Sequence, residues 1–227
     1  MNKVGHIAII PDGNRRWAKK HSKSLLEAYD IGIRKIFDVL KWAKEREVKI
    51  MSFWGFSTEN FKRSEEEKSI LWELFDKFLT KGIEEMEKRR NNEVRVNFLG
   101  RIYMLPKSIY EKMIFIMDKT KENKPYTLNL LMAYGGRAEI VDAVNKAIKN
   151  GKPVDETSFS NYLYTNGMPD PDIIIRTGGE IRLSGLLPWQ SVYSELFFIN
   201  KLWPDFSKDD FDNIMDEFSK RKRKFGK

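Results

Sequence analysis

The sequence predicts an α/β fold, a single domain built on a six-stranded, mostly parallel sheet that is flanked by helices. Three observations lead to this prediction. Six short segments are continuously apolar or β-branched, as expected of strands covered on both faces of a parallel sheet. Stretches with helical apolar spacing lie between them, so strand and helix alternate. No repeat, low-complexity stretch or linker divides residues 1–227.

The predicted strands share short length and an excess of Ile, Leu, Phe and Val. They span residues 6–10, 49–56, 94–100, 126–134, 172–177 and 195–199. Three helices are predicted from apolar residues that recur every three or four positions. Their apolar positions are Leu26, Tyr29, Ile33, Ile36, Phe37 and Leu40; Leu71, Phe75, Phe78, Leu79 and Ile83; and Ile140, Val141, Val144 and Ile148.

Two helix starts carry capping signals. Ser64 followed by Glu67 forms a capping-box pattern, which favours a helix cap over any ligand role for Glu67. Ser207, with Asp209 and Asp210 behind it, predicts the start of a final helix, where the dipole favours acidic residues. The apolar stripe of the helix after Ser64 is typical of a core-facing surface, and it is equally suited to lining a cavity.

Composition excludes several classes of chemistry. The chain has no cysteine, which rules out disulfides and thiolate catalysis, and its two histidines argue against a zinc site. The first residues lack a signal-peptide pattern, so we expect a cytoplasmic protein. The longest nearly uncharged run, 183–200, contains Pro188 and Glu195 and is shorter than a bilayer span.

The net charge of +8 is unevenly distributed. Six Lys or Arg lie in the basic C-terminal tail, residues 220–227, and without that tail the balance is only +2. The tail is either solvated surface or a contact for nucleic acid, anionic lipid or an acidic partner. Because the rest of the chain is nearly neutral, we do not expect nucleic acid to be the substrate.

Polar side chains follow the predicted strands, and the first five strand ends each deliver an arginine. Ligands bind at the carboxyl ends of the strands in open parallel sheets. The residues at these ends are Asp12, Gly13, Asn14, Arg15 and Arg16; Ser57, Thr58, Glu59, Asn60, Phe61, Lys62 and Arg63; Arg101; Gly135, Gly136 and Arg137; and Arg176, Thr177, Gly178, Gly179, Glu180, Arg182, Leu183 and Ser184.

This pattern indicates phosphate binding. The arginine guanidinium holds phosphate oxygens in bidentate fashion, and glycines let backbone N–H groups approach an anion. Asp12 is the one carboxylate of the first cluster, and Mg²⁺ is satisfied by one or two carboxylates plus phosphate oxygens. Each feature also has a structural explanation: Asp12-Gly13 as a turn, Gly135-Gly136 as a tight strand-to-helix turn, and Arg137 as a surface residue. Their coincidence favours the phosphate site.

The same motifs resemble the cis-prenyltransferases of the undecaprenyl diphosphate synthase type. The similar stretches are DGNRRW at 12–17, FSTENFKRS at 56–64, YGGR at 134–137, PDIIIRTGGEIRLSGLLPWQ at 171–190 and YSELFFINKLWPDF at 193–206. The resemblance implies a homodimer with an apolar tunnel. It also implies an enzyme that repeatedly condenses isopentenyl diphosphate onto an allylic diphosphate with Mg²⁺, forming the long polyprenyl diphosphate precursor of a glycosyl carrier lipid.

The resemblance also implies roles for individual residues. Asp12 would be the essential carboxylate and Asn60 would stand at the carbon that loses a proton, while Asp12 and Glu195 would serve the metal. The implied substrate-binding residues are Gly13, Asn14, Arg15, Arg16, Trp17, Ser57, Thr58, Glu59, Phe61, Arg63, Arg176, Arg182, Leu183 and Ser184. An apolar product also implies peripheral contact with a membrane.

The chain departs from the family pattern at several positions. Arg15 replaces a bacterial glycine and resembles the archaeal and eukaryotic branch. Leu25 and Tyr29 occupy the places of an arginine and a histidine that bind the allylic diphosphate in many members, and Ile181 that of a metal-associated histidine. A C-terminal Arg-x-Gly that crosses the dimer reads Lys224-Phe225-Gly226, where lysine keeps the charge without the fork.

Overall fold

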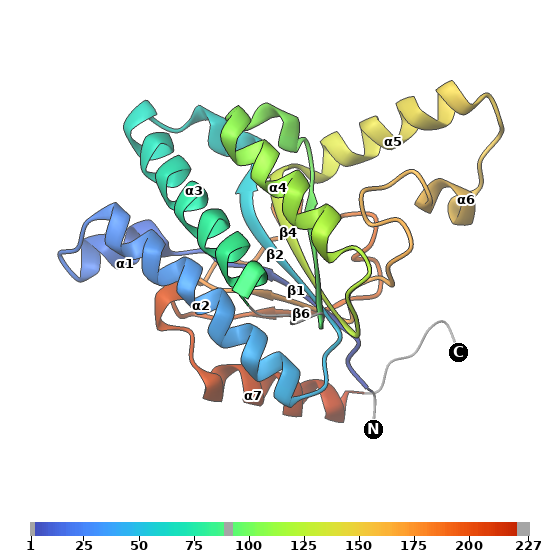
Figure 1. Cartoon of the computed structure of the whole chain (residues 1–227). Helices are drawn as coiled ribbons and strands as arrows, with labels where there is room; N and C mark the ends of the chain where they lie inside the picture. Colours follow the sequence, from blue (N-terminus) through green and yellow to red (C-terminus); the bar gives the residue numbers. More distant parts are fainter. Residues whose placement is uncertain (1–2, 89–92, 222–227) are drawn as a thin grey trace.

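The structure, a computed structural model, describes residues 3–88 and 93–221. Figure 1 shows a central sheet between two unequal layers of helices and loops. All five strand pairings are parallel, and the order is β3-β4-β2-β1-β5-β6. The strands are β1 His6–Ile10, β2 Ile50–Ser57, β3 Val94–Leu99, β4 Tyr126–Tyr134, β5 Ile173–Arg176 and β6 Glu195–Phe198. All six predicted strands and the parallel sheet are therefore confirmed.

The helices confirm the sequence predictions and add to them. They are α1 Asn14–Lys20, α2 Leu25–Glu45, α3 Glu65–Lys88, α4 Lys107–Thr120, α5 Gly136–Asn150, α6 Glu156–Ser160 and α7 Lys208–Lys220, with short 3₁₀ turns η1 Thr58–Lys62, η2 Ile102–Met104 and η3 Trp203–Asp205. The sequence reading did not predict α4 or α6. The α7 capping box is formed, with Asp210 at its third position.

Side-chain alternation along β1 divides the core between the two faces of the sheet. Ile7 and Ile9 pack with residues of α2 and α7 in one cluster, whereas Ala8 and Ile10 pack with Leu186 and Leu187 on the other face. A further cluster joins α3 and α4 to β3 and β4. In Figure 1, α2, α3, α4 and α7 cover one face, and α5, α6 and long loops lie on the other side. Every residue of β1 is buried, as its unbroken apolar sequence predicts.

The carboxyl ends of all strands lie at one edge of the sheet. At this edge Gly13 forms the turn that leads from β1 into α1. Gly13 precedes α1 with φ 112°, a left-handed conformation that favours glycine. A Cβ at this position would lie 2.9 Å from Leu202 Cδ2, which adds a steric reason for glycine. Asp12, directly before Gly13, therefore lies at the edge of the sheet where β5 ends in Arg176.

A row of buried polar side chains crosses the sheet nearer to the amino ends of its strands. His6 Nδ1 donates to the Pro169 carbonyl at 2.8 Å, so its Nε2 accepts from the Ser52 hydroxyl at 2.8 Å. Asn129 Nδ2 in turn donates to Ser52 Oγ at 3.0 Å. Burial lowers the pKa of His6 from 6.5 to about 4, so the ring is neutral in the folded protein.

We expect this histidine to make stability fall with acidification. Because its pKa is lower in the folded state, the unfolded chain binds more protons between about pH 6.5 and pH 4. The free energy of unfolding should therefore drop by roughly 2 kcal/mol from pH 7 to pH 5 on account of His6. Urea titrations of the wild type and of His6→Gln measure this term. An identical pH dependence in both proteins would contradict it.

Candidate active site

Asp12 and Arg176 form the centre of the polar site. Asp12 follows β1, and its Oδ2 accepts from Arg176 Nη2 at 2.8 Å, while its Oδ1 accepts from Arg16 Nη2 at 3.2 Å. The Arg176 side chain, only 6% exposed, also donates through Nη1 to Ser184 Oγ at 2.8 Å and to the Arg182 carbonyl at 2.5 Å. One guanidinium thus joins the ends of β1 and β5 to the loop after β5.

Two buried polar atoms at this site have no hydrogen-bond partner within the described residues. They are Arg176 Nε and Asn14 Oδ1. Asn14 is held by its Nδ2, which donates to the Pro11 carbonyl at 3.2 Å, and both residues line the cavity described below. Buried polar groups are normally satisfied, so an unpaired donor and an unpaired acceptor in one cavity indicate a place for a polar ligand.

Ser184 adds a strained backbone to the site. Its φ is 52°, in the left-handed region that residues other than glycine seldom adopt. The Ser184 side chain is nevertheless held on Arg176, because the surrounding loop is fixed by the buried Tyr134 hydroxyl, which accepts from the Leu187 N–H at 3.2 Å. Tyr134 itself donates to Glu139 at 2.6 Å. Such strain is found where the surrounding structure dictates the geometry, as at binding sites.

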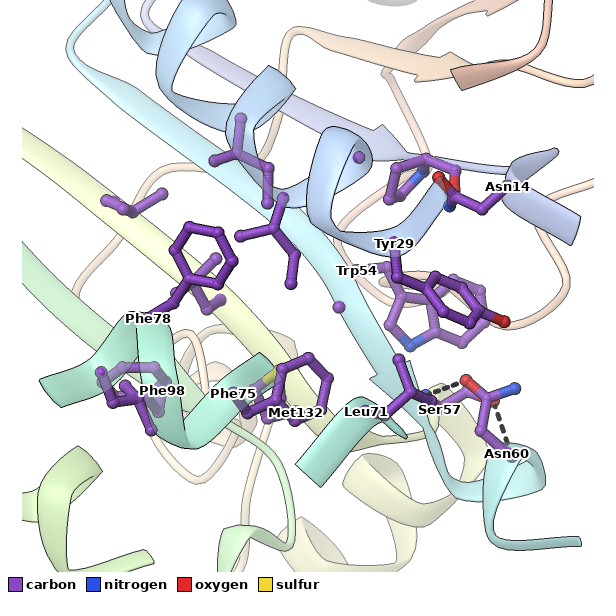
Figure 2. A pocket seen from close by; sticks show the side chains of 18 of the residues that line it. Asn14, Tyr29, Trp54, Ser57, Asn60, Leu71, Phe75, Phe78, Phe98 and Met132 are labelled. Carbon is purple, nitrogen blue, oxygen red and sulfur yellow. Dashed lines mark hydrogen bonds between the residues drawn. The ribbon is translucent and has the colours of Figure 1, made fainter. Parts of the chain in front are cut away.

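The loop after β2 forms a second rim of the site. Ser57 and Asn60 cap η1 reciprocally: the Ser57 N–H donates to Asn60 Oδ1 at 2.9 Å, and the Asn60 N–H donates to Ser57 Oγ at 3.3 Å (Figure 2). This pair fixes the Asn60 side chain at the mouth of the cavity. Phe61 packs edge-on to Phe56 with ring centroids 5.0 Å apart, which anchors the loop from below.

A third cluster joins α2 and α3 at the same mouth. Tyr29 donates its hydroxyl to Glu67 at 2.5 Å and accepts from Arg63 Nη1 at 3.0 Å. Arg63 also pairs with Glu67 at 2.9 Å, and Arg15 lies 3.8 Å from the same carboxylate. Burial chiefly, with Glu67 beside it, raises the pKa of Tyr29 well above its usual value, so the hydroxyl remains a donor.

This cluster corrects one prediction. The Ser64 hydroxyl does accept from the Glu67 N–H at 3.2 Å, as an N-cap should. The Glu67 carboxylate, however, turns to Tyr29 and the arginines rather than back to Ser64, so the capping box is only half formed. The sequence analysis missed the role of Glu67 because its position favoured a helix cap, and it noted Tyr29 as an apolar helix position and as a departure from the family pattern.

An apolar cavity of about 500 Å³ opens from this polar rim (Figure 2). Its rim residues are Asp12, Asn14, Tyr29, Ser57, Asn60, Arg63, Arg176 and Ser184. Its apolar walls come from α2, α3, α4 and the strands β2, β3 and β4. They include Ile33, Ile36, Phe37, Trp54, Leu71, Phe75, Phe78, Leu79, Val96, Phe98, Met113, Ile116, Leu130 and Met132. The apolar stripe of α3 therefore lines a cavity, one of the two alternatives that the sequence left open.

Other candidate residues are not part of this lining. Gly13 lies against Leu202, and Trp17 donates its Nε1 to Asp205 at 2.7 Å. Thr58 donates to Glu59 at 3.1 Å, and Arg182 donates to Glu180 at 2.6 Å. Leu183 packs against the cluster behind the site.

Two of the five strand-end arginines do not line the cavity. Arg101 makes a bidentate pair with Asp142, at 3.0 and 2.8 Å, and Arg137 is exposed on the surface of α5. Arg137 therefore fits the surface role that the sequence left open for it, and Arg101 forms an ion pair between β3 and α5. Hydrogen bonding to Asp142 raises the pKa of Arg101, as befits a structural ion pair.

Glu195 lies far from Asp12. It begins β6, in register with Ile173 of β5 and so with Ile7 of β1, whereas Asp12 lies beyond the carboxyl end of β1 at Ile10, which is three residues or roughly 10 Å further along the strand direction. Its carboxylate accepts from Arg221 Nη1 at 2.5 Å. The two carboxylates of one chain therefore cannot share an ion. Lys224-Phe225-Gly226 and most of the basic tail lie outside the described residues.

The fold and the site together define a class of protein. A parallel α/β sheet that holds arginines and one carboxylate at the mouth of a long apolar cavity fits ligands with an anionic head and a hydrocarbon tail. Among the described residues, no helix is long and apolar enough to cross a bilayer.

Comparison with known proteins agrees with this class and names a family. The family model described as "Putative undecaprenyl diphosphate synthase" matches residues 10–226. The chain belongs to the undecaprenyl diphosphate synthase family of cis-prenyltransferase enzymes.

Individual relatives are similar over nearly their whole length. An isoprenyl transferase of Thermotoga maritima is 45% identical over 97% of this chain and 96% of its own. A tritrans,polycis-undecaprenyl-diphosphate synthase (geranylgeranyl-diphosphate specific) of Pyrococcus horikoshii is 46% identical over 98% of this chain and 86% of its own. Among solved structures, lavandulyl diphosphate synthase from Lavandula x intermedia, in complex with dimethylallyl diphosphate, superposes with TM-score 0.92 at 30% identity, covering 99% of both chains.

Proposed function

We propose that this protein elongates an allylic diphosphate by repeated addition of isopentenyl diphosphate in cis configuration, making a long polyprenyl diphosphate that serves as precursor of a glycosyl carrier lipid. The observation that carries this proposal is the continuity of the Asp12–Arg176 site with the apolar cavity. The polar rim suits the diphosphates, and the cavity suits the growing hydrocarbon. The relatives' names, isoprenyl transferase and undecaprenyl-diphosphate synthase, agree with it.

We assign the two diphosphates to the two sides of Asp12. Gly13, Asn14, Arg15, Arg16 and Trp17 surround the allylic diphosphate at the start of α1. Arg176, Arg182, Leu183 and Ser184 hold isopentenyl diphosphate at the end of β5. The direct contacts from Arg176 to Asp12 and Ser184 support adjacent placement of the two anions, since one guanidinium touches both sides. Holding two reactants together makes their condensation effectively unimolecular.

In each addition the allylic C–O bond breaks, diphosphate leaves, a C–C bond forms, and isopentenyl diphosphate loses a proton. Fixed arginines stabilise the negative charge that develops on the leaving diphosphate. Asn60 stands beside the carbon that loses the proton, on a loop that also presents Ser57, Thr58, Glu59, Phe61 and Arg63. The reciprocal cap between Ser57 and Asn60 keeps that amide in one orientation.

The donor set fits a magnesium ion that takes most of its ligands from phosphate. Asp12 offers a carboxylate, and Asn14 offers a buried amide oxygen without a partner within the described part of the chain. No group of three or more His, Cys, Asp or Glu within the described residues could hold a metal ion. Bound there, Mg²⁺ would neutralise charge on the departing diphosphate. Given its distance from Asp12, Glu195 would serve such an ion only from a partner subunit.

The assay for this function is incubation with labelled isopentenyl diphosphate, Mg²⁺ and either farnesyl or geranylgeranyl diphosphate, followed by extraction and sizing of the products. A ladder that ends in one dominant long product is the expected result, and it identifies the starter as well. Absence of incorporation with every starter would overturn the proposal and favour a non-catalytic subunit, although the intact Asp12 and arginines argue against that role.

We further propose that the enzyme is a homodimer whose interface includes α5. Val141, Val144 and Ile148 recur at helical spacing on this helix and are all exposed, with Ile148 at 71%. A second copy that covers this stripe would remove it from water, and contiguous exposed apolar surface marks such interfaces.

Replacement of Val144 by lysine should therefore shift the protein from dimer toward monomer in light scattering coupled to gel filtration. If the dimer formed, the charge of the new lysine would be buried in the interface without a partner, at a cost of several kcal/mol. Lys149→Glu, which changes a charge on an exposed polar position of the same helix, is the matched control and should leave the mass unchanged. A Val144→Lys protein that remains as dimeric as the wild type would place the interface elsewhere.

Because the product is apolar, we also propose that this enzyme, which we expect to be cytoplasmic, makes peripheral contact with a membrane.

A further inference from the structure

An exposed phenylalanine lies on the outer surface that α2 and α3 form together. Phe37 of α2 is 56% exposed, although its side chain also lines the cavity. Its ring meets Phe78 of α3 with centroids 6.4 Å apart, so the aromatic contact bridges the two helices. Single apolar side chains are common on protein surfaces and need no explanation by themselves. The charges around Phe37 set it apart from such a case.

Four exposed cations surround Phe37. Arg34 and Lys41 lie three positions before it and four positions after it on α2, which places both next to it on the helix surface. Lys77 and Lys81 lie on α3, four positions apart and therefore also neighbours on one helix face. The cations of α3 belong to the half of the helix that contacts Phe37. The first half instead exposes acidic residues, which are Glu65, Glu66 and Glu73.

Two of the four cations are held at the contact between the helices. The Arg34 guanidinium and the Lys77 ammonium lie over the Phe78 ring, 5.8 and 5.7 Å from its centroid. Both also pair with Asp30, at 2.5 and 3.1 Å. Because two cations share one carboxylate, Asp30 neutralises only part of their charge.

The other two cations are not neutralised. Lys41 and Lys81 form no ion pair with any residue that the structure describes. Asp38, the neighbour of Phe37 in the chain, lies 3.9 Å from Lys35. The surface therefore carries an excess of positive charge around an exposed aromatic ring.

This combination suits a bilayer that contains anionic lipid. Lysine and arginine are attracted to anionic headgroups, and an aromatic ring enters the boundary between headgroups and acyl chains. Phe37 also forms part of the wall of the apolar cavity, and the proposed product of the enzyme is itself a lipid. In Figure 1, α2 and α3 cover the opposite side of the sheet from α5, so the proposed dimer interface leaves their outer surface free.

We propose that Phe37 and the four cations around it form the surface through which the protein docks on an anionic phospholipid bilayer. This inference rests on the proposed function, for which it locates the membrane contact. Binding to a bilayer requires no turnover, however, so the two are measured separately. Because the attraction is largely electrostatic, it should weaken as added salt shortens the Debye length.

Flotation with vesicles tests the role of the charges. At about 0.05 M salt the wild type should bind vesicles of phosphatidylglycerol and phosphatidylcholine roughly tenfold more tightly than at about 0.5 M salt or on phosphatidylcholine alone. Lys41→Glu combined with Lys81→Glu should weaken this binding roughly tenfold. Neither lysine lines the cavity, so the double variant should incorporate isopentenyl diphosphate in detergent solution as the wild type does. Lys149→Glu combined with Lys152→Glu makes the same charge change at exposed positions in and just after α5, and this control should bind vesicles normally.

A fluorescent label identifies the part of the chain that touches the bilayer. The chain has no cysteine, so an environment-sensitive fluorophore can be attached to one introduced thiol. Labelled Phe37→Cys should shift its emission to shorter wavelength on anionic vesicles, and labelled Lys149→Cys should not. Absence of vesicle binding, binding without a shift at residue 37, or undiminished binding by the Lys41→Glu, Lys81→Glu variant would overturn the docking surface. A wild type that docks as expected but incorporates nothing would overturn the elongation and keep the surface.

Discussion

Replacement of Asp12 by alanine is expected to lower turnover by roughly 10²- to 10³-fold while the chain still folds. Asp12 is the carboxylate that contacts both Arg16 and Arg176 at the mouth of the cavity. Without Asp12 the site loses the hard oxygen donor that suits Mg²⁺. It also loses the acceptor that orients the guanidinium groups of Arg16 and Arg176. The fold should persist, because Arg176 keeps its bonds to Ser184 and to the Arg182 carbonyl.

The measurement is the steady-state rate of isopentenyl diphosphate incorporation, with circular dichroism and thermal unfolding as the check on folding. Asp12→Asn should be nearly as inactive, since the amide keeps the shape but loses the charge. Asp38→Ala, which removes an exposed carboxylate from α2, serves as control and should turn over normally. Full activity in Asp12→Ala would remove Asp12 from its proposed role.

Arg176→Lys is expected to reduce kcat/KM by roughly 10²-fold, mainly through a higher KM for isopentenyl diphosphate. Lysine retains the positive charge, but its single ammonium cannot reproduce the planar fork that reaches Asp12, Ser184 and the Arg182 carbonyl together. The substitution also leaves part of a buried polar network unsatisfied, so a lower melting temperature should accompany the kinetic defect.

Arg101→Lys makes the appropriate comparison. Arg101 also follows a strand and forms a bidentate pair with a carboxylate, but that partner is Asp142, away from the cavity lining. Its replacement should lower stability by about 1 kcal/mol and leave kinetic constants unchanged. If both variants lost activity equally, the effect of Arg176→Lys would reflect folding rather than the site.

The polar rim is organised as three separately anchored pieces. Arg176 ties the end of β5 to Asp12, the Ser57–Asn60 cap fixes the loop after β2, and Tyr29 with Glu67 joins α2 to α3.

Tyr29 occupies the place that the resemblance gives to a histidine in many family members. Tyr29 is a donor at all ordinary pH values, since burial raises the pKa of its hydroxyl. A histidine at this place would change its charge near neutral pH. In this chain, the positive charge at the rim is instead supplied by Arg63 and Arg15, which both lie near Glu67.

Much of the protein followed from sequence alone, for a physical reason. Short, continuously apolar runs such as His6–Ile10 favour strands buried on both faces, and their alternation with amphipathic helices makes a parallel sheet the natural solution. Parallel strands place their carboxyl ends at one edge, so the sequence also indicated that Asp12 and Arg176 would meet. The helix start at Ser207 could be predicted from the sequence because a helix cap depends on residues only three positions apart.

Only the tertiary structure decided what depends on contacts between distant segments. Spacing predicts an apolar face on α3 but not whether that face packs against side chains or lines a cavity, so the sequence left both alternatives open and the structure decided for the cavity. Arg101 and Arg176 follow strands alike, yet Asp142 neutralises one while Asp12 holds the other at the rim. Glu195 looks like a second metal ligand by motif, but the register of β6 places it near the opposite end of the sheet, because parallel pairing fixes position along the strand.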